Sequence, residues 1–318
     1  IVANLGNANP MGGAKRVHEL AEELGVKGLR VAVVLGDDLL AFMDGDEVAA
    51  LPTIEGVSID GKEIVAANAY LGARPVAEAL KLDVDIVLVG RTTDAALVLG
   101  PLIHEFGWGE TDWDLLASGT LAGHLLECGG QVTGGYFCDP GFKDVPGMDN
   151  LGFPIGEINA DGSIVITKAE NTGGLVSKAT VIEQMLYEMH DPSAYLTPDV
   201  SLNITNVSLA EDGKDRIRVS GARGAPPPET LKVTISADGG WLGEADMIYA
   251  GPNALARAQL AADIVRKRCE RYGITDPMRI EIIGTGAVFD NDTSDRGRGS
   301  NMPKDGEYRL RAAVRTQD

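Results

Sequence analysis

Three side chains that can carry out chemistry lie close together in the segment G-H-L-L-E-C-G-G, namely His124, Glu127 and Cys128. Positions three and four apart share one face of a helix, so they could form a metal site, an acid–base pair or part of a packed core. A zinc site needs further protein ligands, and the nearest candidates, His104 and Glu105, form no H-E-x-x-H or C-x-x-C pattern. We therefore expect no metal site. His124 and Glu127 remain candidate catalytic proton carriers, and the alternative is a hydrogen-bonded histidine in the core.

Polar side chains also follow four short segments that have the composition of strands, 1–3, 31–35, 64–67 and 84–89. Ligands of open α/β sheets bind outside the carboxyl ends of the strands, so these side chains are expected to line one polar crevice. We assign Asp38 and Asp94 as candidate proton carriers. The residues that we assign to substrate binding are Asn4, Asn7, Asn9, Asn68, Arg91, Thr92 and Thr93.

A structural role is the alternative for most of these residues. Asn, Asp and Thr are common in turns and at helix N-termini, so any one of them could serve as a cap. Capping does not explain an arginine. Arg91 could bind an anionic group, or it could form a structural ion pair with Asp94.

Helical periodicity alternates with the four strands, in segments 13–24, 75–81, 94–106 and 113–128. Their apolar residues recur at three- and four-residue steps. Alternation of strands and helices predicts a parallel sheet with crossover helices, which is an α/β fold. In the last of these helices, His124 and Cys128 belong to the apolar stripe and Glu127 lies at its margin.

From residue 131 the pattern changes to turns and antiparallel strands. Segment 152–168 is typical of a hairpin around Ala160-Asp161-Gly162. Further strands are expected before and after one long helix at about 252–272. We therefore expect two domains, an α/β domain over 1–130 and an α+β domain over 131–318. The further strands are expected at 200–209, 216–219, 230–236, 241–249, 278–283 and 308–314.

A glycine-rich segment, E-N-T-G-G-L-V-S-K, precedes an expected helix in the second part of the chain. Backbone N–H groups at such a helix start can bind an anion, so we assign Thr172, Gly173 and Gly174 to substrate binding. A structural turn is the alternative. The Walker A pattern is not met, because Ser177 rather than glycine precedes Lys178.

Composition restricts the partners of the chain. A formal net charge of −19 argues against a nucleic-acid surface, which needs a basic stripe, so an anionic substrate must be bound by a few local cations. No apolar run reaches the roughly 18 residues of a membrane helix. Three cysteines without a C-x-x-C pair favour a reducing, cytoplasmic location. The chain begins I-V-A-N in an expected strand, so we expect further N-terminal sequence before it.

Several long segments have a familiar pattern, among them G-P-L-I-H-E-F-G-W, D-W-D-L-L-A-S-G-T-L-A-G-H-L-L-E-C-G-G-Q-V-T-G-G-Y-F, L-G-F-P-I-G-E-I-N-A-D-G-S and Y-E-M-H-D-P-S-A-Y-L-T-P-D-V. They closely resemble the acyclic terpene utilisation protein AtuA family, and the likeness covers nearly the whole chain. The start differs, because N-L-G-N-A-N-P stands where the family tends to have N-A-G-G-x-N-P. The resemblance implies a role in bacterial catabolism of citronellol- and geraniol-type compounds through acyl-CoA intermediates. It assigns no catalytic residue.

Together these patterns predict an enzyme, of the lyase or hydratase type, that acts on a branched acyl-CoA or a related carboxylate. The reaction would be hydration, dehydration or C–C cleavage, with no cofactor beyond the CoA of the substrate. Arg91 would hold an anionic group, amides of the strand-end asparagines would orient a carbonyl, and Asp94 or Asp38 would move a proton. The alternative is a non-catalytic binding or assembly subunit of an acyl-CoA-processing complex, with an exposed apolar patch. A homo-oligomer is compatible with either function.

Overall fold

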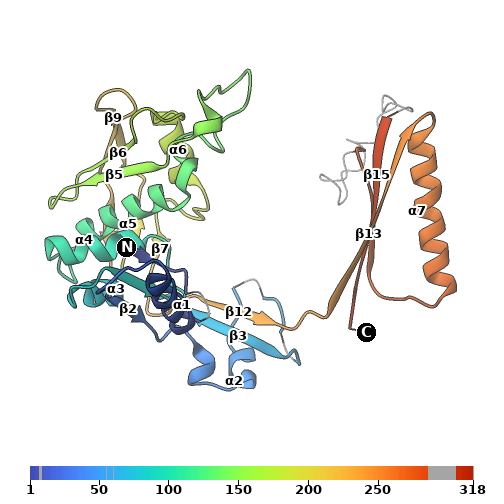
Figure 1. Cartoon of the computed structure of the whole chain (residues 1–318), viewed down its shortest axis with the longest axis horizontal. Coiled ribbons are helices and arrows are strands. Elements are labelled where there is room, and N and C mark those ends of the chain that lie inside the picture. Colours follow the sequence, from blue (N-terminus) through green and yellow to red (C-terminus); the bar gives the residue numbers. More distant parts are fainter. Residues whose placement is uncertain (7–8, 55, 60, 286–305, 318) are drawn as a thin grey trace. The chain divides into compact units, whose positions relative to one another are not determined.

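The computed structural model describes residues 1–6, 9–54, 56–59, 61–285 and 306–317. Contacts within the chain divide it into two compact units, Ile1–Ala237 and Asp238–Asp318. The expected domain boundary after residue 130 falls inside the first unit, because buried residues on both sides of it share one hydrophobic core. Figure 1 shows the elements of both units in the colours of the sequence. None of the described helices is long and apolar enough to cross a membrane.

The first unit begins with a three-stranded parallel sheet in the order β1 (Val2–Ala3), β4 (Ile86–Val89), β2 (Val31–Val34). The central strand β4 is buried along most of its length, as expected for a parallel strand that is covered on both faces. Helices α1 (Pro10–Glu23) and α3 (Arg74–Leu80) lie in the crossover connections. The predicted α/β fold class is confirmed.

The third expected strand, β3 (Ile64–Ala69), does not join this parallel sheet. It pairs antiparallel with β12 (Val233–Ala237), and its two buried residues, Ala67 and Ala69, lie on one face of the strand. Two isolated bridges, Asp38↔Asn68 and Leu71↔Thr92, nevertheless connect the end of β3 to the segments that follow β2 and β4. The polar ends of β2, β3 and β4 therefore meet although β3 belongs to another sheet. A short helix, α2 (Gly45–Ala49), precedes β3.

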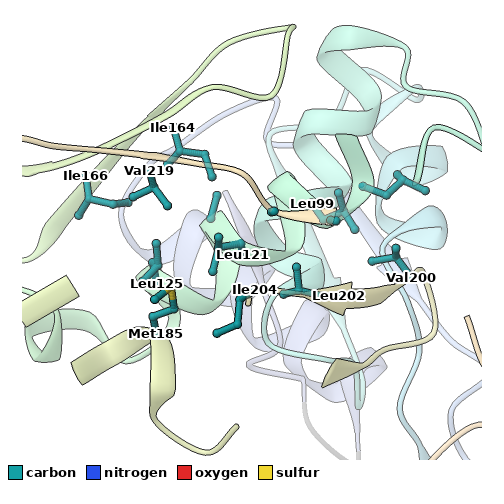
Figure 2. Close-up of a cluster of buried hydrophobic side chains, with 14 of the residues drawn as sticks. Leu99, Leu121, Leu125, Ile164, Ile166, Met185, Val200, Leu202, Ile204 and Val219 are labelled. Atoms are coloured by element: carbon teal, nitrogen blue, oxygen red, sulfur yellow. The ribbon is translucent and has the colours of Figure 1, made fainter. Parts of the chain in front are cut away.

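Helix α5 (Trp113–Glu127) runs through the main core of the first unit, and α4 (Ala96–Phe106) packs beside it. Nine consecutive or nearly consecutive residues of α5 are buried, so the helix has no fully solvated face in its second half. Figure 2 shows Leu121 and Leu125 of α5 between Ile164, Ile166 and Val219 on one side and Leu202 and Ile204 on the other.

The rest of the first unit is built from antiparallel strands, and they cover α5. The predicted hairpin is confirmed, because two strands pair with Ile158 opposite Ile164 around the expected turn. One four-stranded sheet has the order β5 (Pro154–Ile158), β6 (Ile164–Lys168), β10 (Ile217–Ser220), β9 (Ser208–Glu211). A three-stranded sheet has the order β11 (Arg223–Ala225), β8 (Ser201–Asn203), β7 (Tyr195–Leu196), and helix α6 (Lys178–Leu186) packs on α5 and β9.

The second unit is a three-stranded antiparallel sheet with one helix. Its strands have the order β13 (Trp241–Gly251), β15 (Gly306–Thr316), β14 (Met278–Ile283). Helix α7 (Ala254–Arg271) covers one face, where Ala254 and Ala258 pack against Tyr308. The other face carries charged side chains in ion pairs, which is the usual division of an antiparallel sheet into a packed and a solvated face.

Candidate active site

A buried carboxylate organises the carboxyl ends of β2, β3 and β4. Asp37, which follows β2, is only 3% exposed. Its Oδ2 accepts hydrogen bonds from Asn68 Nδ2 at 3.0 Å and from the backbone N–H of Arg91 at 2.7 Å. Gly90 allows this contact, because a Cβ at residue 90 would lie 2.5 Å from Oδ2 and 2.6 Å from Cγ of Asp37. Asp37 therefore fixes the positions of Asn68 and Arg91, which the sequence assigned to substrate binding.

Arg91 lies on an aromatic ring and not against a carboxylate. Its Cζ is 4.1 Å from the centroid of the Tyr70 ring, and Lys232 Nζ is 4.9 Å from the same centroid. Within the described part of the chain, Arg91 forms no ion pair and its buried Nε has no hydrogen-bond partner. The structural ion pair with Asp94 is thus not formed. A guanidinium held by cation–π stacking keeps its N–H groups for an anion.

Asp94, the second strand-end carboxylate, is exposed to solvent just before α4. Asn4 Nδ2 lies 3.5 Å from Asp94 Oδ1, at the outer limit of a hydrogen bond. The chain from Asp94 then passes directly over α5, because a Cβ at Gly123 would lie 2.6 Å from the Cα of Ala95. Glycine at position 123 therefore brings the strand-end residues to the part of α5 that carries His124.

His124 and Glu127 form a buried pair in the last turn of α5. His124 is 0% exposed, and its Nδ1 lies 2.9 Å from Oε1 of Glu127, whose side chain is 12% exposed. The contact is within ion-pair distance, but neither ring nitrogen of His124 has the alignment of a hydrogen bond to a described residue. Gln184 of α6 donates to the backbone carbonyl of His124 at 2.8 Å. The imidazole is therefore held mainly by packing, and its two ring nitrogens are available for hydrogen bonds, unlike those of a fully hydrogen-bonded core histidine.

Tyr195 closes this region from β7, and the sequence did not assign it. Its ring centroid is 5.5 Å from that of His124. Burial raises the pKa of Tyr195 to about 12, and the negative charges of Glu127 and Asp94 act in the same direction. The tyrosine hydroxyl is thus a hydrogen-bond donor at neutral pH. The only hint in the sequence is its place in the segment M-H-D-P-S-A-Y-L, which carries a family pattern and no catalytic motif.

Cys128 shares this environment. Burial raises the pKa of the thiol, a hydrogen bond with Gln184 opposes that effect, and the nearby carboxylates Glu127 and Asp94 raise the pKa further. A protonated thiol is a poor nucleophile and a poor metal ligand. Among the described residues, no group of three or more His, Cys, Asp and Glu side chains is arranged to hold a metal ion. The negative charges of Asp94 and Glu127 therefore act on both Tyr195 and Cys128, and they raise the pKa of each.

Several strand-end residues have the structural roles that the sequence left as alternatives. Asn9 caps α1 by accepting from the N–H of Gly12 at 2.8 Å, and exposed Asp38 caps the 3₁₀ helix Leu39–Ala41 by accepting from Leu40 at 3.0 Å. Thr92 is buried and donates to the carbonyl of Leu71 at 2.7 Å.

Thr93 and Asn7 are the remaining two strand-end candidates for substrate binding. Thr93, two residues after Arg91, has a buried Oγ1 without a hydrogen-bond partner among the described residues. Asn7 lies outside the described residues.

Thr172, Gly173 and Gly174 form a packed turn. The N–H of Gly173 donates to the carbonyl of Asn150, and the N–H of Gly174 donates to that of Pro146, each at 2.7 Å. The hydroxyl of Thr172 donates to the carbonyl of Ala169 at 2.6 Å. Because these donors are engaged within the protein, they are not free to bind an anion, and the structural-turn alternative describes the segment.

Comparison with known proteins identifies the family of the chain. The family model for acyclic terpene utilisation family protein AtuA matches residues 1–318, the whole chain. No match was found among the curated proteins or the solved structures. The resemblance inferred from the sequence segments is therefore confirmed, and the family places the chain in acyclic terpene utilisation.

Proposed function

This chain belongs to the acyclic terpene utilisation protein AtuA family, and from that membership we propose that it is an enzyme acting on a branched acyl-CoA or a related carboxylate. The reaction is hydration, dehydration or C–C cleavage next to the acyl carbonyl. Each of these reactions moves a proton to or from the substrate and builds negative charge on a carbonyl oxygen, so each needs a proton carrier and a group that stabilises an anion.

The observation that carries the proposal is the state of Arg91. This cation stacks on Tyr70, is fixed through its backbone by Asp37, and has no carboxylate partner among the described residues. In a chain with 47 acidic residues against 28 basic ones, a partly buried arginine without an ion pair is best explained by an anionic ligand. Asn68, held by Asp37 at 3.0 Å, supplies an amide beside it.

The proton carriers lie on the α5 side of the same region. Asp94 is exposed and is the more accessible base, with Asn4 near its carboxylate. The His124–Glu127 pair is buried, and Tyr195 presents a neutral hydroxyl next to it. We assign Asp94 to proton abstraction, Tyr195 to hydrogen-bond donation toward a developing oxyanion, and Glu127 to holding the His124 imidazole.

The test is binding and turnover with a panel of branched acyl-CoA thioesters, the corresponding free acids and straight-chain thioesters. Isothermal titration calorimetry should show binding that Arg91→Ala weakens by about 10- to 100-fold, the amount expected for hydrogen bonds to a charged group. The matched control is Arg218→Ala in β10, an exposed arginine whose ion pair with Asp212 lies in another sheet. Equal loss, or no loss, in both variants refutes the assignment of Arg91.

Turnover separates an enzyme from a binding subunit. Product formation followed by mass spectrometry should fall strongly in Asp94→Asn while ligand affinity changes little. A parent protein that binds the thioesters through Arg91 and converts none of them, alone or with cell lysate, would be a binding subunit and not the enzyme proposed.

A further inference from the structure

Strand β13 of the second unit lies at an edge of its sheet, and near its end the carbonyl of Ala250 accepts a hydrogen bond from Arg257. It spans 11 residues and pairs with β15 in an unbroken register from Trp241↔Thr316 to Gly251↔Gly306. Its opposite edge has no partner strand among the described residues. Trp241 is 72% exposed and Ile248 is 71% exposed, and Leu242 and Met247 are also exposed. A long edge of this kind offers unpaired backbone N–H and C=O groups to another strand.

The features that normally protect such an edge are missing from β13. It contains no proline and no lysine, and its register with β15 shows no bulge. Its two acidic residues do not present free charges either. Glu244 is ion-paired with Arg311, and Asp246 lies 2.5 Å from Arg309, both on the inner neighbour β15.

The sequence of β13 is symmetric in residue type about Ala245. Trp241 and Tyr249 are both aromatic and lie four residues from Ala245 on either side. Leu242 and Ile248 are both aliphatic and lie three residues from Ala245 on either side. Glu244 and Asp246 are both acidic and directly flank Ala245. Only Gly243 and Met247, two residues from Ala245 on either side, differ in size. A strand with this symmetry can pair with a copy of itself about a two-fold axis, because the same patch then meets itself.

We propose that β13 pairs antiparallel with β13 of a second copy of this chain, with the two-fold axis at Ala245. The two three-stranded sheets become one continuous antiparallel sheet. On the face covered by α7, Trp241 of each copy packs beside Tyr249 of the other, and on the opposite face Leu242 packs beside Ile248. Aromatic and aliphatic pairs directly opposite each other are the pairs that stabilise antiparallel strands.

The area of the seam fits a second copy. Glu244 of each copy lies opposite Asp246 of the other, a like-charge pair that opposes pairing, and the arginine that each acid keeps on β15 offsets this repulsion. A specific interface buries at least about 1,000 Å². Burial of one large aromatic ring contributes roughly 150–250 Å², so the two Trp241 rings would supply about a third to a half of that area.

Disulfide trapping tests the register. In the proposed dimer Ala245 lies opposite Ala245 of the other copy, at a Cα separation of about 4.5–5.5 Å that suits a disulfide. Ala245→Cys in the full chain should therefore cross-link to a covalent dimer on mild oxidation, seen by non-reducing electrophoresis. The controls are the parent chain, which retains Cys128, Cys138 and Cys269, and Ala250→Cys. Position 250 lies at the far end of the strand, so its two copies would be about 30 Å apart.

Analytical ultracentrifugation provides the second measurement. The parent should be dimeric, and the exposed double variant Leu242→Lys/Ile248→Lys should be monomeric, with a circular dichroism spectrum like that of the parent. A monomeric parent would show that the proposal is wrong, and protection from hydrogen exchange of those β13 amides that point away from β15 would then show that another part of the chain covers the edge. The proposal would also be wrong if Ala245→Cys and Ala250→Cys cross-linked equally, or if the lysine variant remained dimeric. None of these results depends on the proposed activity of the first unit.

Discussion

Replacing Gly90 with alanine should remove Asp37 from its position at the strand ends. The added Cβ would lie 2.5 Å from Oδ2 and 2.6 Å from Cγ of Asp37, whereas non-bonded heavy atoms sit about 3.5–4.0 Å apart. The carboxylate must therefore retreat by about 1 Å. That movement breaks its hydrogen bonds to Asn68 Nδ2 and to the N–H of Arg91, which are now 3.0 Å and 2.7 Å long.

The magnitude follows from those two bonds. A hydrogen bond to a charged group contributes about 1.5–3 kcal/mol, so loss of both costs about 3–6 kcal/mol. Alanine also lowers the conformational entropy of the unfolded chain relative to glycine, which offsets about 0.4–1 kcal/mol of the lost free energy of unfolding. We expect Gly90→Ala to lower the free energy of unfolding of the first unit by about 2–5 kcal/mol, and to weaken ligand binding because Arg91 loses its backbone anchor.

Urea unfolding followed by tryptophan fluorescence measures this change. Trp108 and Trp113 report on the first unit and Trp241 on the second, so the experiment is done with Trp241→Phe as the parent. The control is Gly13→Ala in α1, where a Cβ would meet nothing nearer than 3.5 Å. The same chemical change should stabilise the protein there by about 0.5–1 kcal/mol, because alanine is the better residue inside a helix.

A double-mutant cycle decides whether Asp37 is the cause. Once Asp37→Ala has removed the carboxylate, Gly90→Ala should cost much less than it does in the parent. If Gly90→Ala changes the free energy of unfolding by less than about 0.5 kcal/mol, or costs the same with and without Asp37, the reasoning about this contact is refuted.

Three further predictions concern Tyr195, the core and α6. The pKa of Tyr195 is about 12 in the folded protein and about 10 in an unfolded chain. Because the unfolded chain loses this proton at a lower pH, the free energy of unfolding should fall as the pH rises from about 10 to 12. Urea midpoints at a series of pH values should show that fall in the parent and less of it in Tyr195→Phe; parallel curves would contradict it. Leu121→Ala, at a fully buried position, should cost about 2–5 kcal/mol in the same unfolding assay, and a cost below 1 kcal/mol would mean that the core around α5 is looser than described. Ser177→Ala removes the cap that accepts from the N–H of Thr180 and should cost about 1 kcal/mol. Ser193→Ala is the comparison for loss of a hydroxyl hydrogen bond without a helix cap, because Ser193 Oγ donates to Asp191 Oδ1 at 2.7 Å in an exposed loop.

Local periodicity was sufficient to predict the longer helices of the first unit, whereas the five-residue helix α2 was not expected. The spacing of apolar residues predicted a helix at 113–128, and α5 occupies Trp113–Glu127. It also placed His124 on the buried stripe, where the structure has it at 0% exposed. Both properties depend on neighbouring residues along the chain, which is why a single sequence contains them.

Strand partners were less predictable, because pairing depends on residues far apart in the chain. The segment that became β3 has an ordinary strand composition, and nothing in it indicates β12 as its antiparallel partner. Adjacent residues raise the same difficulty. Asp37 and Asp38 are identical in chemistry, and side chains in extended backbone alternate between faces, so the sequence could not tell which would point inward. The structure buries Asp37 and leaves Asp38 exposed as a cap.

The glycine-rich segment at residues 172–174 had a composition that fits two structures. An anion-binding loop and a packed turn both require glycine, and they differ only in what the backbone N–H groups contact. Here those groups donate to Pro146 and Asn150, which come from a different part of the sequence. Tyr195 was missed for the same physical reason, since its importance comes from contacts with α5 and not from its neighbours in the chain.

Asp94 determines whether the strand ends and the end of α5 act as one site. Its carboxylate lies 3.5 Å from Asn4 on the strand-end side, and its charge also acts on Tyr195 on the α5 side. An anion held by Arg91 would add negative charge to a region that already contains the carboxylates of Asp94 and Glu127. That added charge would further oppose deprotonation of the Tyr195 hydroxyl and so keep it a hydrogen-bond donor toward a developing oxyanion. Because the effect of Asp94 on Tyr195 passes through charge and not through contact, Asp94→Asn should remove it while leaving the fold of the strand ends in place.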